Sequence, residues 1–178
     1  MSSPAPIGLH AMETNAIQTP HITERAEQQY AYVTRTVTMD TFSEVVDRIP
    51  VVIGWLAERG LAPAGAPFLR YRVIDMERRF VVDAGVPVAD PVTGDEVVQA
   101  DVLPAGRYAT VTHRGHPDQL IEVTASLLAW ADEHGHRWDM TPAADGDHWG
   151  GRLETFHTHP AEVAIDDWVT ELAFRLAE

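Results

Sequence analysis

The segments YAYVTRT (30–36) and YATVTHR (108–114) decide the fold, because they are two copies of one element. They are identical at four of seven positions, and Tyr108 follows Tyr30 by 78 residues. Both are rich in β-branched and aromatic residues, which is typical of a β-strand. A second pair, WLAERG (55–60) and WADEHG (130–135), matches Trp, Glu and Gly at an offset of 75. Repetition at a nearly constant offset predicts two tandem units of one structure.

Each unit is predicted to be a strand, a helix and two further strands. In the first unit apolar residues recur at helical spacing over 39–60, where Pro50 should kink or divide the helix. The other expected elements are a hairpin of 67–75 with 78–88, a strand–turn–strand at 97–115, a helix at 117–135, and strands within 148–159 and 167–178.

The fold class expected from this pattern is α+β, with antiparallel sheets and two units related by a pseudo-twofold axis. The first unit spans about 29–90 and the second about 96–178, and we expect residues 1–28 to be a disordered leader. Neither unit covers both faces of its own sheet, so the two units should meet each other. A central ligand cleft is expected where they meet.

The composition limits the partners of this chain. Its 178 residues carry 13 basic and 27 acidic side chains, a net charge of −14, and every basic residue is arginine. No basic run is present, which argues against nucleic acid as a partner, and no apolar run of 18 residues predicts a membrane span. The absence of cysteine excludes disulfides and thiol nucleophiles and is compatible with the cytoplasm, where we expect the protein. A negative protein attracts cations at long range.

The usual catalytic signatures are absent from the sequence, including the nucleophile elbow, the P-loop and the zinc-protease motif. Nine histidines raise the possibility of a metal site. His157 and His159 share a strand face, but no third ligand follows at a diagnostic spacing. We therefore expect no metal and no cofactor.

Glu154 is the leading candidate for a functional residue. In the stretch GRLETFHTHP (151–160), alternation puts Glu154 and Phe156 on one face of a strand. The pair lies either at a wet sheet edge or inside a pocket. If the carboxylate is buried among aromatic rings, burial should raise its pKa unless a cation lies beside it. Such a site suits a bulky lipophilic cation, because the rings add cation–π attraction to the charge of the carboxylate.

Other candidates are the aromatic residues and one acid that could line the same cleft. The repeat places Tyr71 roughly opposite Glu154, and we favour a pocket position for it. Asp83 either faces inward or caps a turn. Three tryptophans beside loops and strand starts line the cleft or pack in the core, and two further aromatic side chains complete the candidate set: Trp138, Trp149, Trp168, Phe80 and Tyr108.

Three motifs resemble the GyrI-like small-molecule-binding family, which includes the effector-binding domains of AraC-type and multidrug-responsive MerR-type regulators. They are PFLRYRVID with VDAGVPV (67–75 and 82–88), LPAGRYATVTHRGHPDQL (103–120), and ETFHTHP with WVTEL (154–160 and 168–172). The resemblance covers about residues 30–177. It implies a duplicated fold whose central cleft binds drugs, often lipophilic cations.

The resemblance also implies roles for single residues. Glu154 matches the pocket glutamate of the family's E-x-Y element, and Phe156 replaces the usual tyrosine. Tyr71 matches the tyrosine that follows PF, and Asp83 stands where the family often has glutamate. Only about thirty unpatterned residues precede the domain, so we expect no helix-turn-helix and a stand-alone member of the family.

We therefore expect a protein that binds or sequesters lipophilic, cationic aromatic molecules. One alternative is a cofactor-free hydrolase of reactive cyclopropyl-type natural products, with Glu154 as the base. Another is a protein-interaction module that acts on a partner such as DNA gyrase. Binding is favoured over catalysis, and the sequence leaves the oligomeric state open.

Overall fold

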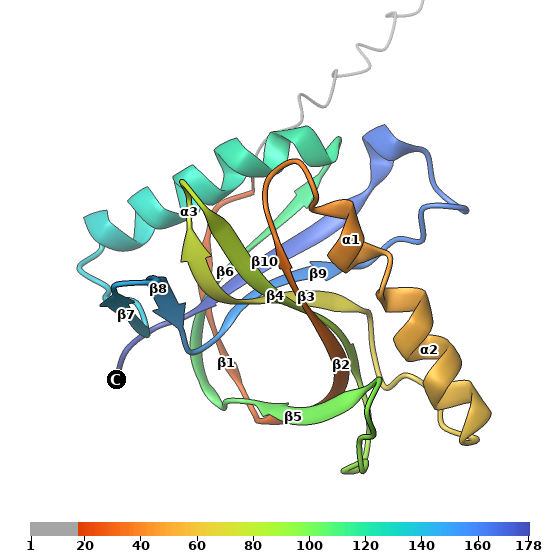
Figure 1. Ribbon diagram of the computed structural model, residues 1–178. Helices are drawn as coiled ribbons and strands as arrows, with labels where there is room; N and C mark the ends of the chain where they lie inside the picture. Colours follow the sequence, from red (N-terminus) through yellow and green to blue (C-terminus); the bar gives the residue numbers. More distant parts are fainter. Residues whose placement is uncertain (1–17) are drawn as a thin grey trace, which may run out of the picture.

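A curled antiparallel sheet organises residues 18–178, the part of the chain that the computed structural model describes (Figure 1). Within this range the sheet has ten strands: β1 (His21–Arg25), β2 (Gln28–Val37), β3 (Phe68–Asp75), β4 (Arg79–Pro87), β5 (Gln99–Leu103), β6 (Gly106–Arg114), β7 (Met140–Ala143), β8 (Gly146–Trp149), β9 (Arg152–Phe156) and β10 (Val169–Arg175). The helical elements are α1 (Ser43–Val46), α2 (Ile49–Glu58), α3 (Leu120–Glu133) and the 3₁₀ turns η1 (Pro117–Gln119) and η2 (Ile165–Asp167). None of these helices is long and apolar enough to cross a membrane.

The strand order confirms the predicted α+β duplication. The main path of the sheet runs β1-β6-β10-β9-β3-β4-β2-β5. The first unit supplies β2, α1, α2, β3 and β4, and the second supplies β6, α3, β9 and β10. Strands β3 and β9 pair at the middle of the path, with Leu69 opposite Glu154. The two units therefore join edge to edge into one continuous sheet.

The two units also exchange their first strands. Strand β1 pairs with β6 of the second unit, and β5 pairs with β2 of the first. The repeat offset of 78 places 21–25 on 99–103, the bounds of β1 and β5. The predicted end of the leader at residue 28 was therefore too late in the sequence, because residues 21–25 form a paired strand. The rest of the expected leader, residues 1–17, lies outside the described part of the chain.

The other elements lie close to their predicted positions. The predicted helix over 39–60 is divided as expected, although the break falls at Asp47 and Arg48, before Pro50. Pro50 lies in the first turn of α2, where its missing N–H interrupts no helical hydrogen bond. The hairpin of β7 and β8 was not predicted; it extends the sheet beside β3.

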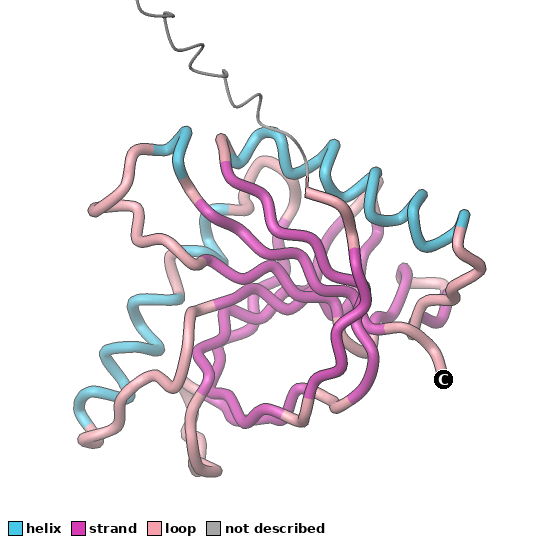
Figure 2. The backbone as a smooth tube through the Cα atoms, turned by 180° about the vertical axis from the view of Figure 1, so that it is seen from behind, coloured by secondary structure: helices cyan, strands magenta, loops and turns pink. Residues whose placement is uncertain are grey.

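Alternation along the strands gives the sheet two different faces. The helix-side face packs against the helices, with α1 and α2 on β2 and β4 and α3 on β6. We call the opposite face, on the inside of the curl, the inner face; Figure 2 shows the strands forming a ring around it. The inner face has its own buried cluster: Tyr30, Phe68, Leu103, Tyr108, Leu153 and Ala173.

Candidate functional site

Glu154 and Tyr71 form a hydrogen-bonded pair on the helix-side face. The Tyr71 hydroxyl donates to Glu154 Oε2 at 2.8 Å. Leu69 is the residue directly opposite Glu154, so the tyrosine reaches its partner diagonally across the β3–β9 pair. Both side chains are half-buried. The structure thus brings together the two candidates that the sequence ranked highest.

Arg152 is the cation nearest to this pair, and the sequence analysis did not single it out. Its guanidinium carbon lies 4.3 Å from the ring centre of Phe174, 4.6 Å from that of Trp149 and 5.8 Å from that of Tyr71. Burial lowers the pKa of Arg152 to about 10, so the side chain stays charged at neutral pH. The sequence does contain a signal for Arg152, because this residue precedes Glu154 by two positions and strand alternation puts both side chains on one face.

The charge of Glu154 is only partly compensated by the protein. Burial raises the pKa of Glu154 above its usual range, and the Tyr71 hydrogen bond and the Arg152 charge oppose that shift without cancelling it. Burial and the neighbouring Glu154 charge also raise the pKa of Tyr71 well above its ordinary value, so the phenol remains a donor. Within residues 18–178, no basic nitrogen lies within 4.0 Å of the Glu154 carboxylate. The carboxylate can therefore accept a further positive partner.

An aromatic side chain that was also not predicted covers the pair. Phe42, just before α1, stacks on Tyr71 with ring centres 6.0 Å apart and meets Phe80 edge-on at 6.4 Å. Phe156 packs against the same core from β9, on the same face as Glu154. The surroundings of Glu154 are therefore aromatic, as the pocket hypothesis requires.

Four other candidates differ from one another in their surroundings: Phe80, Trp149, Trp138 and Trp168. Phe80 and Trp149 are core residues, only 5% and 8% exposed, and Trp149 packs against Trp138 and Phe174. The half-buried Trp138 thus belongs to the Arg152 end of the site. Trp168 lies between η2 and β10, and its Nε1 donates to the carbonyl of Val163.

Asp83 and Tyr108 lie on the inner face, so the structure does not bring them to Glu154. Asp83 is completely buried and accepts hydrogen bonds from Thr34 Oγ1 at 2.7 Å, Tyr30 at 3.0 Å and Arg72 Nε at 2.7 Å. The Tyr108 hydroxyl donates to the carbonyl of Pro104. The physical reason is strand parity: Phe80 and Asp83 are three residues apart in β4, which places them on opposite faces.

Two cavities in the described part of the molecule lie away from Glu154. One cavity of about 420 Å³ lies on the inner face, against the cluster that contains Phe68 and Tyr108. Another of the same volume lies beside Arg72 and Trp149. Neither of these two cavities is lined by Glu154 or Tyr71. Among the described residues, no group of three or more acidic or histidine side chains is arranged to hold a metal ion.

Comparison with known proteins identifies the fold. Residues 18–177 match the model of the GyrI-like small molecule binding domain. No curated protein matches the sequence.

Several solved structures are similar. The EcmrR C-terminal domain is 17% identical, with a TM-score of 0.70 over 90% of this chain and 98% of that one. In the EcmrR–DNA complex the values are 19% and 0.73, and this chain spans only 57% of the EcmrR chain. A hydrolase from Listeria innocua is 13% identical, with a TM-score of 0.59 over 89% of this chain and 91% of that one. SAV2435 bound to tetraphenylphosphonium is 10% identical, also with a TM-score of 0.59, over 90% and 94%. At these identities the likeness establishes the fold.

Proposed function

The chain belongs to the GyrI-like small molecule binding domain family, and we propose that it binds lipophilic aromatic cations on the helix-side face, with Glu154 as their counter-ion. The observation that carries this proposal is the state of the Glu154 carboxylate. It lies among aromatic rings, its pKa is raised by burial, and its hydrogen-bond partner is the neutral hydroxyl of Tyr71. A monocation placed beside it would relieve the unfavourable burial of its charge.

The rings around Glu154 suit such a ligand. Arg152 already lies over three of the aromatic rings on this face, which shows that they can hold a positive charge. Its guanidinium is closer to Phe174 and Trp149 than to Tyr71, toward the end of the site away from Phe42. A ligand cation near Phe42 and Tyr71 would therefore lie on the other side of Glu154 from Arg152. Both positive charges would then interact with the Glu154 carboxylate.

Binding requires the cover over Tyr71 to move, because Phe42 stacks on the Tyr71 ring and neither of the two cavities reaches Glu154. Phe42 is the side chain best placed to move. It is half-buried, and it precedes α1, a helix of four residues with no side-chain capping hydrogen bond. Such a short helix adds little stability of its own, so displacing Phe42 needs only a local rearrangement. The tetraphenylphosphonium-bound relative SAV2435 supports the choice of ligand class.

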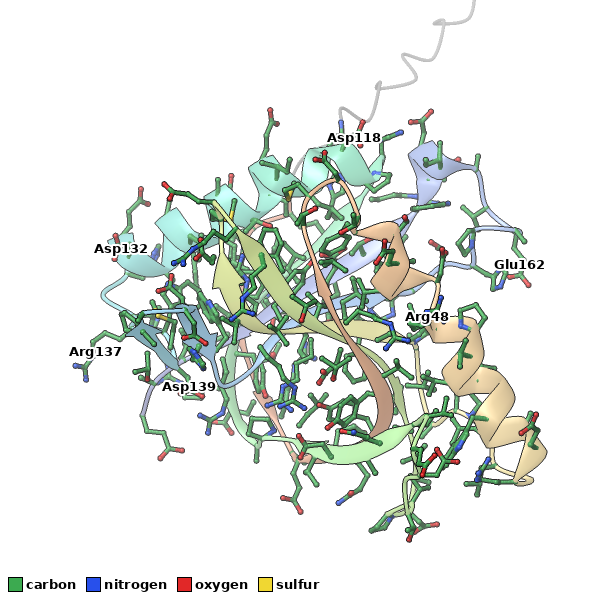
Figure 3. The ribbon with its side chains drawn as sticks, in the orientation of Figure 1. Arg48, Asp118, Asp132, Arg137, Asp139 and Glu162 are labelled. Carbon is green, nitrogen blue, oxygen red and sulfur yellow. The ribbon has the colours of Figure 1, made fainter. Side chains whose placement is uncertain are left out.

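Calorimetric titration with tetraphenylphosphonium tests the proposal. The control ligand is tetraphenylborate, which has the same shape and the opposite charge. We expect the cation to bind, the borate not to bind, and Glu154→Gln to weaken the cation by about tenfold, or about 1.4 kcal/mol. The control variant is Glu162→Gln, because Glu162 is exposed and points outward from the loop after β9 (Figure 3). Equal affinity of the Glu154→Gln and Glu162→Gln variants would refute the counter-ion role.

A second candidate function is hydrolysis of reactive cyclopropyl-type compounds, with Glu154 as the base that activates water. The raised pKa of Glu154 favours it, because a more basic carboxylate removes a proton more readily near neutral pH. In such a step water adds to a ring carbon, the ring C–C bond breaks and its electron pair passes to a conjugated carbonyl oxygen; the Tyr71 hydroxyl, 2.8 Å from Glu154 Oε2, is the nearby donor for that oxygen. Turnover of such a compound by the wild type, lost in Glu154→Gln, would distinguish catalysis from binding alone.

A further inference from the structure

The inner-face cavity lies at a position where the two repeats differ. Cross-strand pairing gives each repeat a threonine opposite an acid: Thr34 faces Asp83 in the first, and Thr112 faces Glu171 in the second. The offset of 78 relates the two threonines, so Asp83 and Glu171 occupy equivalent positions. Asp83 is completely buried in a satisfied network, whereas Glu171 lines a cavity of about 420 Å³. One position in the duplicated fold thus has two different environments.

The residues on the neighbouring strands explain why space remains in the second repeat. Arg70 is paired with Asp83 across β3 and β4, and its guanidinium extends to the Tyr30 hydroxyl at 2.8 Å. Thr155 is the residue paired with Glu171 across β9 and β10. A short threonine therefore stands where the first repeat has a long cationic side chain. Thr155 and Glu171 both line the cavity.

Glu171 has capacity for another positive partner. Its Oε1 accepts from Arg25 at 2.8 Å, and its Oε2 lies 3.8 Å from His157 Nε2, beyond hydrogen-bonding distance. Of the charged side chains on the cavity wall, Arg25 is positive and Glu27 and Glu171 are negative, which leaves a net charge of −1 with His157 neutral. The whole protein carries −14. Charge complementarity therefore favours a cation.

Most of the remaining wall is apolar, with Gln28, Thr155 and His157 as its polar side chains. Phe68, Leu103, Tyr108 and Leu153 face the cavity from four strands. A cavity of this volume with apolar walls and a few polar groups is typical of a small-molecule site. It is on the opposite face of the sheet from Glu154, so it is independent of the function proposed above.

We infer that the inner-face cavity is a second ligand site, for a small apolar amine in its protonated form. The ammonium group binds Glu171 Oε2 in the space beside Thr155, whose short side chain stands at the position of Arg70 in the first repeat. The hydrocarbon body packs against Phe68, Tyr108 and Leu153.

Calorimetric titration with cyclohexylmethylamine, an apolar amine without an aromatic ring, tests this site, with cyclohexylmethanol as the neutral control. We expect the amine to bind at least about tenfold more tightly than the alcohol. Glu171→Gln removes the charge, and Thr155→Arg fills the space as Arg70 does in the first repeat; each should weaken the amine at least about tenfold. Glu162→Gln, at an exposed position, should leave it unchanged. Two variants at different positions keep the test usable if one of them fails to fold.

The inference is overturned if the wild type does not bind the amine, or binds the alcohol equally well. It is also overturned if Glu171→Gln binds the amine like the wild type, or if saturating tetraphenylphosphonium displaces the amine. Failure of the helix-side site would instead appear in the Glu154→Gln titration with tetraphenylphosphonium, so the two results are distinguishable.

Discussion

Asp83 and Glu154 are carboxylates on the two faces of one sheet, and they are satisfied in different ways. On the inner face, Asp83 is completely buried and is paired with Arg72 and two hydroxyl groups. On the helix-side face, Glu154 accepts from Tyr71 and has a raised pKa. The protein supplies the counter-ion on one face and leaves it incomplete on the other.

This difference separates a structural acid from a functional one. A buried carboxylate with its own guanidinium and hydrogen bonds has no reason to bind a ligand, and its removal takes a buried counter-charge away from that guanidinium. A carboxylate with only a neutral partner prefers to be protonated or to gain a cation. Resemblance to a family placed both residues in one ligand site, and only the environment of each carboxylate distinguishes them.

The largest expected effect is on the inner face. Asp83→Asn should lower the free energy of unfolding by about 3 kcal/mol, because Arg72 loses the carboxylate that pairs with it at 2.7 Å. The control is Asp167→Asn, since that side chain is 62% exposed and only reaches Arg114 at 4.0 Å. The control should change stability by less than about 0.5 kcal/mol. Urea denaturation measures both, and similar values would remove the distinction between the two faces.

A smaller effect is expected at the hydroxyl that joins the inner network. Tyr30 donates to Asp83 at 3.0 Å and accepts from Arg70 at 2.8 Å. Tyr30→Phe should therefore lower stability by about 1.5 kcal/mol. Tyr32→Phe, on the same strand face, loses only an exposed hydrogen bond to Gln99 and should cost a few tenths of a kcal/mol. Equal losses in urea would show that the hydroxyl does not support Asp83.

Much of the fold could be predicted from the sequence, because the repeat and the strand alternation are local patterns. The pair of Tyr71 and Glu154 could be ranked for the same reason. Strand β1 was missed because HITER (21–25) has no strong strand pattern, although the offset of 78 already mapped it onto β5. The exchange of first strands between the repeats depends on long-range pairing, which no local pattern specifies.

The side chains and cavities on each face of the sheet were harder to predict. The parity of β4 separates Phe80 from Asp83, and this rule was available from the sequence. The cover that Phe42 forms over Tyr71 was not, because it depends on where the helices pack against the sheet. Nor could the sequence show that a cavity lies beside Glu171 and that its wall does not include Glu154. A cavity remains where side chains do not fill the space between packed elements, and a single sequence does not show how they fill it.

The smallest expected effect is a gain in stability rather than a loss, and it tests most directly whether Glu154 differs from Asp83. Glu154→Gln should leave the ligand-free protein as stable as the wild type at pH 7, or more stable by up to about 1 kcal/mol, because an amide oxygen still accepts from Tyr71 and the buried charge is removed. A raised folded pKa means that the folded wild type holds its proton more tightly than the unfolded chain does. The stability of the wild type should therefore rise toward that of the variant as pH falls through the folded pKa toward the ordinary value of 4.5. Urea denaturation of both proteins across this range measures the gap; a gap that widens on acidification would show that Glu154 is paired as Asp83 is.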